Sequence, residues 1–213
     1  MWHGAIDHTH DVRTDARCSH FRPHLSPGSP NEEPGSTAAI TSPSSDETLV
    51  VGAVHSPVGT FHAALSSAGL CCLAFPGDPL DACERWVRRW IRSARRSDDR
   101  VGLDWVSTQL TAYFEGQIRE FSVPLDLRGT PFQLQVWNSL RTIPYGETRS
   151  YAQVAMAISR PRAVRAVGAA NGQNPIPILV PCHRVVGSNG ALVGYGGGLD
   201  TKRFLLDLER AAR

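Results

Sequence analysis

The sequence lacks several features that would place it in common classes of protein. Its five cysteines, at positions 18, 71, 72, 83 and 182, are odd in number and include no CxxC pair. This pattern is not a disulfide framework and fits a compartment that keeps thiols reduced. No apolar run approaches the ~18 residues of a membrane span, and the N-terminus has no apolar secretory core. We therefore expect a cytoplasmic protein without membrane segments, or a nuclear one if the source is eukaryotic.

Lysine is nearly absent, and acidic residues are missing from one long stretch. Of the 22 basic residues, only Lys202 is a lysine. Between Arg149 and Arg184 there are five arginines and no aspartate or glutamate. Residues 130–213 carry a net charge of +6, whereas the other 129 residues carry −4. Positive charge gathered in one half favours a polyanionic partner, although a solvated basic face would have the same composition.

Residues 1–46 lack the apolar content of a folded domain. Proline, serine, glycine, threonine and charged residues dominate them, so they cannot bury enough surface to offset the entropy lost on ordering. We predict a disordered tail. It contains five histidines and Cys18, but their spacing matches no zinc pattern, and we expect no metal site.

Residues 47–129 predict a small supporting domain rich in β-strands. Three β-branched or apolar segments separated by turn residues predict an antiparallel meander: 48–54, 61–66 and 70–75. Helical spacing of apolar residues predicts two helices, at 81–97 and 103–114, and a strand-like segment follows at 121–127. No catalytic constellation is visible in this half.

Residues 130–213 predict a second domain of short helices. Thr130 and Pro131 open a helix that runs to Ile143, and Ser150 caps a second over 151–159. A third helix over 162–170 is rich in small residues, and the tight pair resembles helix-turn-helix geometry. A turn at 187–190 and a strand over 191–195 predict a wing, before a last helix that Asp200 caps and that ends near Glu209. The expected fold class is α+β.

The segment from Asn174 to Val186 carries the chemistry. Its apolar run, 176–180, predicts a short buried strand, although prolines at 175, 177 and 181 cannot donate to a ladder. The segment ends in Cys182, His183 and Arg184, which are a nucleophile, a titratable ring and a permanent cation. Rigid placement of a reactive thiol is what nucleophilic catalysis requires, whereas an isolated cysteine is more often a buried hydrophobe.

The motif Asn-Pro-Ile-Pro-Ile-Leu-Val-Pro-Cys-His-Arg-Val-Val closely resembles the active-site segment of the O6-alkylguanine-DNA alkyltransferases. These are also called methylated-DNA–protein-cysteine methyltransferases, and the match runs from about Leu125 to Glu209. The resemblance implies an RNase H-like N-terminal domain and a winged-helix C-terminal domain. It also implies irreversible transfer of one alkyl group from O6-alkylguanine in duplex DNA to Cys182, without a cofactor. We expect a monomer whose partner is that DNA.

The resemblance also implies roles for individual residues. Cys182, His183 and Glu209 would form a relay through a water molecule, and Asn174 would brace the active-site turn. Tyr151 and Lys202 would polarise the guanine leaving group. Arg165 would enter the duplex in place of the extruded base. The expected contacts to substrate and DNA are completed by this set: Val185, Tyr195, Gly196, Arg162, Ala166, Gly168, Asn171 and Arg184.

One position departs from the family pattern. Many relatives have serine or alanine where this chain has Gly196, so the hydrogen bond to guanine would rely on a backbone N–H of a more flexible loop. Two other functions compete with alkyl transfer. A non-catalytic lesion-binding module would lack the cysteine, and a Cys-His hydrolase would turn over repeatedly.

Overall fold

A computed structural model describes residues 47–79, 81–91 and 93–212 of the chain. The predicted tail at 1–46, with its histidines and Cys18, lies outside the described residues. Within the described part, no helix is both long and apolar enough to cross a membrane.

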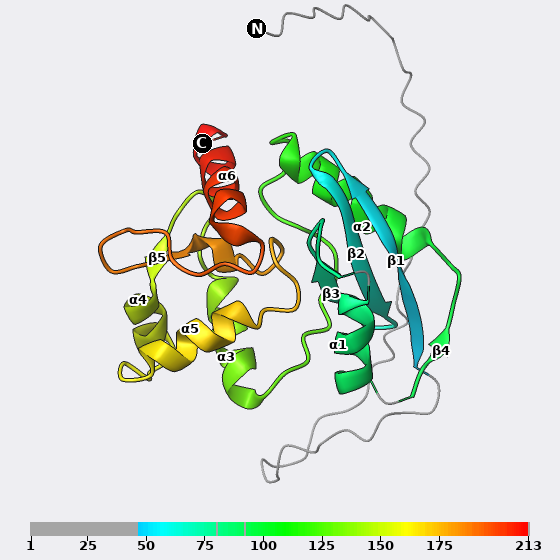
Figure 1. Ribbon diagram of the computed structural model, residues 1–213, viewed down its shortest axis with the longest axis horizontal. Helices are drawn as coiled ribbons and strands as arrows, with labels where there is room; N and C mark the ends of the chain where they lie inside the picture. Colours follow the sequence, from blue (N-terminus) through cyan, green and yellow to red (C-terminus); the bar gives the residue numbers. More distant parts are fainter. Residues whose placement is uncertain (1–46, 80, 92, 213) are drawn as a thin grey trace, which may run out of the picture. The chain divides into compact units, whose positions relative to one another are not determined.

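A four-stranded sheet organises the first half, with strand order β3-β2-β1-β4 (Figure 1). Its strands are β1 (Thr48–Ser56), β2 (Gly59–Ser66), β3 (Gly69–Ala74) and β4 (Arg95–Arg96). The first three form the antiparallel meander that the turn residues predict, whereas β4 pairs in parallel with β1. The edge strand β4 was not predicted.

The two helices of this half are α1 (Ala82–Trp90) and α2 (Val101–Phe114). The second agrees with its prediction, and Gly116 follows it with φ of 72°. The first was predicted to reach residue 97 but ends at Ile91, whose backbone is extended and whose side chain is buried. Further along the chain, Arg95 and Arg96 pair with β1.

Each helix packs with a different hydrophobic cluster of the sheet. Residues of α2 such as Leu103, Val106 and Leu110 share one core with Phe61, whereas α1 contributes to a second, smaller cluster. The smaller cluster contains three cysteines: Cys71, Cys72 and Cys83. Burial raises the pKa of Cys71 to about 12, so this thiol is neutral and unreactive near pH 7.

The predicted strand over 121–127 makes only an isolated bridge, between Leu125 and Leu70. Leu70 N–H donates to the Pro124 carbonyl at 2.8 Å, and Asp126 N–H donates to the Leu70 carbonyl at 2.9 Å. Pro124 has no N–H of its own, which limits the pairing of this segment.

The second half consists mainly of helices (Figure 1). These are α3 (Pro131–Leu140), α4 (Tyr151–Ala157), α5 (Val164–Gly172) and α6 (Gly198–Ala211). Thr130 and Ser150 cap α3 and α4, each in a reciprocal capping box with the glutamine three residues later. A parallel pair of two-residue strands, β5 (Arg149–Ser150) and β6 (Val185–Val186), joins the start of α4 to the cysteine segment.

Three local predictions in this half were wrong. Residues 176–180 form a buried turn instead of a strand, because prolines at 175, 177 and 181 leave few donors for a ladder. The wing strand over 191–195 does not form, and the carbonyls of Val193 and Gly194 accept hydrogen bonds from Lys202 instead. Asp200 lies within the first turn of α6, where Gly197 is the N-cap.

The two halves share one hydrophobic core. The Phe114 ring of α2 stacks on Phe204 of α6 at 6.2 Å between centroids, and Phe75 meets the Tyr195 ring edge-on at 5.5 Å. Leu73 N–H of β3 also donates to the Pro175 carbonyl at 2.8 Å. The first half therefore contacts the segment that leads to Cys182.

Candidate active site around Cys182

Cys182 begins a short 3-10 turn, Cys182–Arg184, and its side chain is almost completely buried. Burial raises the pKa of the thiol to about 11, although the Asn174 side chain, Lys202 and nearby backbone N–H groups favour the thiolate. The resting sulfur is therefore protonated at neutral pH. A nucleophilic role requires a base that takes this proton.

A tight turn immediately before Cys182 fixes the position of the sulfur. Val180 N–H donates to the Ile176 carbonyl at 2.9 Å. The Asn174 side chain closes the turn, because its Nδ2 donates to the Val180 carbonyl at 2.8 Å and its Oδ1 accepts from Ile176 N–H at 3.0 Å. Ile178 adopts φ of 75°, a conformation that costs a β-branched residue roughly 1–3 kcal/mol. The surrounding core holds this strained turn in place.

His183 supplies a base beside the thiol. Its Nε2 lies 2.8 Å from Glu209 Oε1, and both side chains are fully buried. Burial lowers the pKa of His183, so the ring is neutral near pH 7. With Nε2–H donating to Glu209, Nδ1 carries the lone pair, and it has no hydrogen-bond partner among the described residues. The arrangement leaves one basic nitrogen free in a buried site.

Glu209 is held by more donors than a single histidine. The Arg184 guanidinium donates to it through Nε at 3.0 Å and Nη2 at 2.8 Å, and Gly146 N–H donates at 2.9 Å. The hydroxyl of Tyr113, from α2 in the first half, donates at 2.7 Å. Burial opposes ionisation of Glu209, but hydrogen bonds from His183 and Arg184 outweigh it and hold its pKa at about 2. Glu209 is therefore an anionic acceptor at all physiological pH values.

Two donors, Lys202 and Tyr151, lie near the sulfur of Cys182. Lys202 Nζ donates to the carbonyls of Val185 at 2.6 Å and Val193 at 2.9 Å, and the Tyr151 hydroxyl donates to the same Val193 carbonyl at 3.2 Å. Burial lowers the pKa of Lys202 and raises that of Tyr151. The hydroxyl of Tyr195 is buried and has no partner in the described part of the chain.

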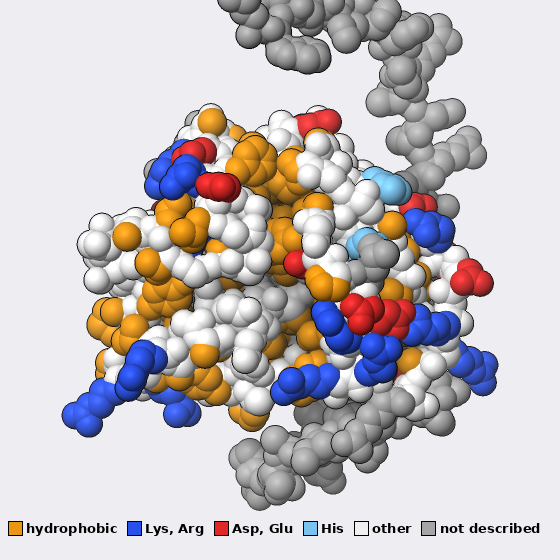
Figure 2. Space-filling view, viewed as in Figure 1, with side chains coloured by type: hydrophobic (Ala, Val, Ile, Leu, Met, Phe, Trp, Pro, Cys, Tyr) orange, Lys and Arg blue, Asp and Glu red, His pale blue; other side chains and the backbone are white. Residues whose placement is uncertain are grey.

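The exposed predicted residues lie on and beside α5. Arg162, Arg165 and Ala166 are exposed, and arginine side chains project over the end where α4 and α5 meet (Figure 2). Gly168 faces Tyr151, because a Cβ on Gly168 would lie 3.9 Å from the tyrosine ring. A basic, small-residue helix surface therefore adjoins the side chains that surround Cys182.

Comparison with known proteins shows the family to which this chain belongs. The model of "6-O-methylguanine DNA methyltransferase, ribonuclease-like domain" matches residues 49–127, and that of the "DNA binding domain" matches 131–211. An inducible methylated-DNA–protein-cysteine methyltransferase of Bacillus subtilis is 45% identical over 152 residues, which cover 71% of this chain and 85% of the relative. The chain belongs to the methylated-DNA–protein-cysteine methyltransferase family.

Other members of the family agree. The Mycobacterium tuberculosis methyltransferase is 63% identical over 103 residues, which span 48% of this chain and 62% of the relative's length. The solved M. tuberculosis O6-methylguanine methyltransferase has a TM-score of 0.66 and 44% identity, covering 78% of this chain and 94% of that one. A structure of the M. tuberculosis protein in complex with DNA matches with a TM-score of 0.64. The fold is thus the two-domain fold of this methyltransferase family.

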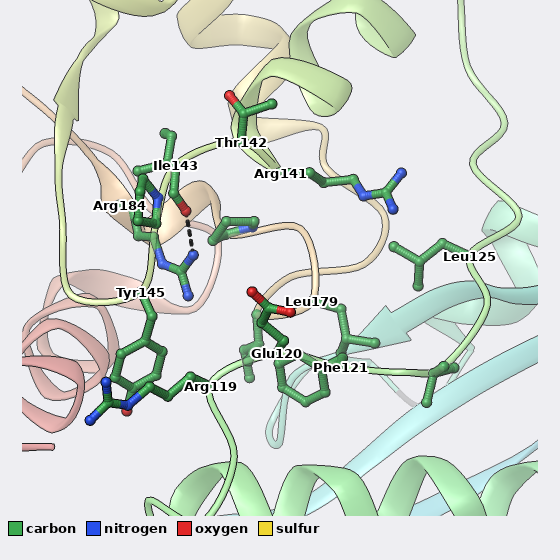
Figure 3. Close-up of a pocket in the computed structure, with 14 residues that line it drawn as sticks. Arg119, Glu120, Phe121, Leu125, Arg141, Thr142, Ile143, Tyr145, Leu179 and Arg184 are labelled. Atoms are coloured by element: carbon green, nitrogen blue, oxygen red, sulfur yellow. Dashed lines mark hydrogen bonds between the residues drawn. The ribbon is translucent and has the colours of Figure 1, made fainter. Parts of the chain in front are cut away.

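Three residues expected at the substrate or DNA have buried side chains in the structure. Arg184 is buried against Glu209, and its Nη1 donates to the Ile143 carbonyl at 2.6 Å (Figure 3). Asn171 is also buried, and its Nδ2 lies 3.5 Å from the Cys182 carbonyl. The side chain of Val185 is buried, so only its carbonyl, already bound by Lys202, points toward the site. The ion pair with Glu209, at 2.8 Å, compensates the buried charge of Arg184.

Besides Arg184, which was expected at the DNA, Tyr113 and Gly146 contact Glu209, and sequence reasoning predicted neither contact. Gly146 contributes a backbone N–H, which leaves no signal in residue type. Tyr113 lies on the apolar stripe of α2, where a tyrosine is indistinguishable from a core residue until its hydroxyl partner is known.

Proposed function

We propose that this protein repairs DNA by transferring the alkyl group of O6-alkylguanine to the sulfur of its own Cys182. The observation that carries the proposal is the buried Cys182 beside a neutral His183 that Glu209 orients. The family to which the chain belongs supports the same reaction. Double-stranded DNA that contains the alkylated base is the proposed partner, and the protein acts as a monomer in a compartment that keeps thiols reduced.

The reaction begins with removal of the thiol proton. His183 Nδ1 accepts it through a bridging water molecule, and Glu209 stabilises the imidazolium that results. The pair of thiolate and imidazolium keeps the buried site neutral overall, which avoids the cost of an isolated charge. The thiolate then attacks the alkyl carbon, a carbon–sulfur bond forms and the bond from that carbon to guanine O6 breaks.

The leaving group needs a proton and a nearby positive charge. The electron pair of the broken bond remains on guanine, whose charge the Tyr151 hydroxyl and Lys202 stabilise. A proton from Tyr151 neutralises the base, and the proton that His183 took from Cys182 replaces it on the Tyr151 oxygen, relayed through water. Tyr195 and the backbone N–H of Gly196 orient the base. No cofactor takes part.

DNA enters from the side of α5. We propose that the base rotates out of the duplex and that Arg165 occupies the space it leaves, while Arg162 contacts phosphate and Ala166 and Gly168 allow close approach of the backbone. The exposure of Arg162, Arg165 and Ala166 supports this docking. The damaged base pair lowers the cost of extrusion.

The decisive experiment measures protein mass after incubation with a duplex that contains one O6-methylguanine. We expect the mass of one methyl group to appear on the peptide that bears Cys182. Cys182→Ala should abolish transfer and keep duplex affinity within about tenfold, since the thiol contributes little to the DNA surface. Cys83→Ala, in the other cluster, is the matched control and should transfer normally. Methyl transfer by Cys182→Ala, or a label on Cys71, Cys72 or Cys83, would contradict the proposal.

A further inference from the structure

The relay depends on one side chain from the other half of the molecule. Tyr113 lies near the end of α2, 96 residues before Glu209, and its hydroxyl donates to Glu209 Oε1 at 2.7 Å. Neither side chain is exposed to solvent. The Tyr113 ring is fixed by three aromatic neighbours: Phe121 at 5.2 Å, Phe114 at 5.4 Å and Tyr145 at 6.0 Å between centroids. The direction of the hydroxyl is therefore set by packing.

We propose that Tyr113 is a positioning residue of the alkyl-transfer site, through which the ribonuclease-like half sets the protonation of His183. The inference rests on the function proposed above. It assigns to the first half a direct part in the chemistry, in place of the purely supporting role that its sequence predicts.

The argument starts from the crowding of Glu209 Oε1. This atom accepts from Tyr113 at 2.7 Å, from His183 at 2.8 Å and from Arg184 Nη2 at 2.8 Å. Arg184 Nε also donates to Oε1, at 3.2 Å. Within the described part of the chain, Oε2 accepts from Gly146 N–H and from this same Arg184 Nε. Tyr113 therefore acts on the same oxygen that orients the histidine. A carboxylate oxygen that already accepts several donors is a weaker base, so it leaves the proton on His183 Nε2 and binds an imidazolium less strongly.

Without the Tyr113 hydroxyl, Glu209 Oε1 accepts one hydrogen bond fewer, and its negative charge interacts more strongly with His183. The imidazole becomes more basic and is protonated at a higher pH, and a protonated ring cannot accept the thiol proton. Several other titratable or charged groups lie near the relay and remain in place: Arg184, Lys202, Cys182, Tyr145 and Tyr195. Because the change removes a neutral hydroxyl, it alters no formal charge in the site.

A simple structural role for Tyr113 makes a different prediction. If the hydroxyl only completes the buried core, its loss lowers stability without moving the pH dependence of Cys182. The chain offers a matched control in Tyr145, which belongs to the same aromatic cluster and has a buried hydroxyl without a hydrogen-bond partner among the described residues. Tyr145→Phe deletes the same atom from the same cluster and breaks no contact to Glu209.

The experiment compares the full chain with Tyr113→Phe and Tyr145→Phe. Two rates are measured from pH 5 to 9 on folded protein: single-turnover transfer from an O6-methylguanine duplex, and alkylation of Cys182 by iodoacetamide without DNA. For Tyr113→Phe we expect transfer on the acid limb of the profile to fall by about threefold or more, as a half-unit displacement of a one-proton limb requires. The acid limb of both profiles should move up by about half a pH unit or more. Duplex affinity should stay unchanged.

The two measurements separate the inference from the function on which it rests. If the parent protein transfers no methyl group, the proposed function fails, and the iodoacetamide profile still tests Tyr113. If Tyr113→Phe matches the parent in both profiles, the inference is overturned. It is also overturned if Tyr145→Phe produces the same displacement, because the effect would then come from packing alone.

Discussion

Glu209 illustrates how burial changes the work of a single residue. It is buried, permanently ionised and surrounded by donors from α2, from the loop after α3 and from the cysteine turn. A charge in this position stabilises the protein only while its partners remain, since an unpaired buried guanidinium is costly. The same carboxylate thus holds the fold together and orients the histidine.

The stability of Glu209→Gln, compared with the parent at different pH values, should show how much the ionised carboxylate stabilises the fold. The folded-state pKa of about 2 lies below the ordinary value of 4.5, so the stabilisation is fully present above pH ~4.5 and is lost as pH falls toward 2. We expect the variant to be less stable by about 3–5 kcal/mol at pH 7, because Arg184 loses its partner. The difference in free energy of unfolding between the parent and Glu209→Gln should shrink by about 3 kcal/mol between pH 5 and pH 2.

Urea unfolding at each pH measures this difference. Asp207→Asn is the control, because its ion pair with Arg210 lies exposed on the same helix and is worth ~0–1 kcal/mol. A constant gap between parent and Glu209→Gln across the whole range would show that the carboxylate is not stabilised in its ionised form.

The turn from Asn174 to Val180 is the element that delivers the cysteine. Sequence reasoning identified its burial, its prolines and the bracing role of Asn174, but predicted a strand. The left-handed Ile178 could not be foreseen, because a β-branched residue strongly disfavours that conformation. The capped starts of α3 and α4 were predictable, since capping depends on adjacent residues alone.

Asn174→Ala should lower both the stability of the protein and the fraction of Cys182 present as thiolate. Two hydrogen bonds are lost inside the turn, which should lower stability by about 1–3 kcal/mol. The Asn174 side chain also favours the thiolate, so its removal should raise the pKa of Cys182 above the present value of about 11. The midpoint of thiol alkylation against pH measures the change.

Asn189→Ala provides the comparison for that turn. Asn189 makes the same kind of side-chain contact to a nearby N–H, at 3.1 Å, in an exposed loop. This variant should leave the thiol midpoint in place. An unchanged midpoint in Asn174→Ala would indicate that the amide holds the turn without acting on the sulfur.

At the scale of the molecule, the two halves differ in how well sequence reveals them. The Pro-Cys-His-Arg motif indicates the family to which the second half belongs, whereas the first half shows only strand and helix periodicity. Its contribution to the site arises from long-range packing, as with Tyr113 and Leu73, and such contacts have no local pattern. The edge strand β4 was missed for the same reason, because its partner lies 47 residues earlier.

Transfer to Cys182 should stop after one event per molecule. The product is a thioether, which has no carbonyl for water to attack and a poor leaving group at sulfur. We expect a burst that ends at about one alkyl group per protein, without a steady-state phase. Quantifying repaired duplex against time at several protein concentrations measures the endpoint. Linear product formation beyond one equivalent would favour a hydrolase.

The burial of Lys202 has a consequence for chemical probing of this protein. It is the only lysine in the chain, and its amine is enclosed by backbone carbonyls. Acylating reagents that target side-chain amines therefore find no accessible group while α6 is docked. The rate at which Lys202 is labelled therefore reports how often the site opens locally. Lysine-directed crosslinkers and immobilisation reagents will not react with a lysine of the folded protein.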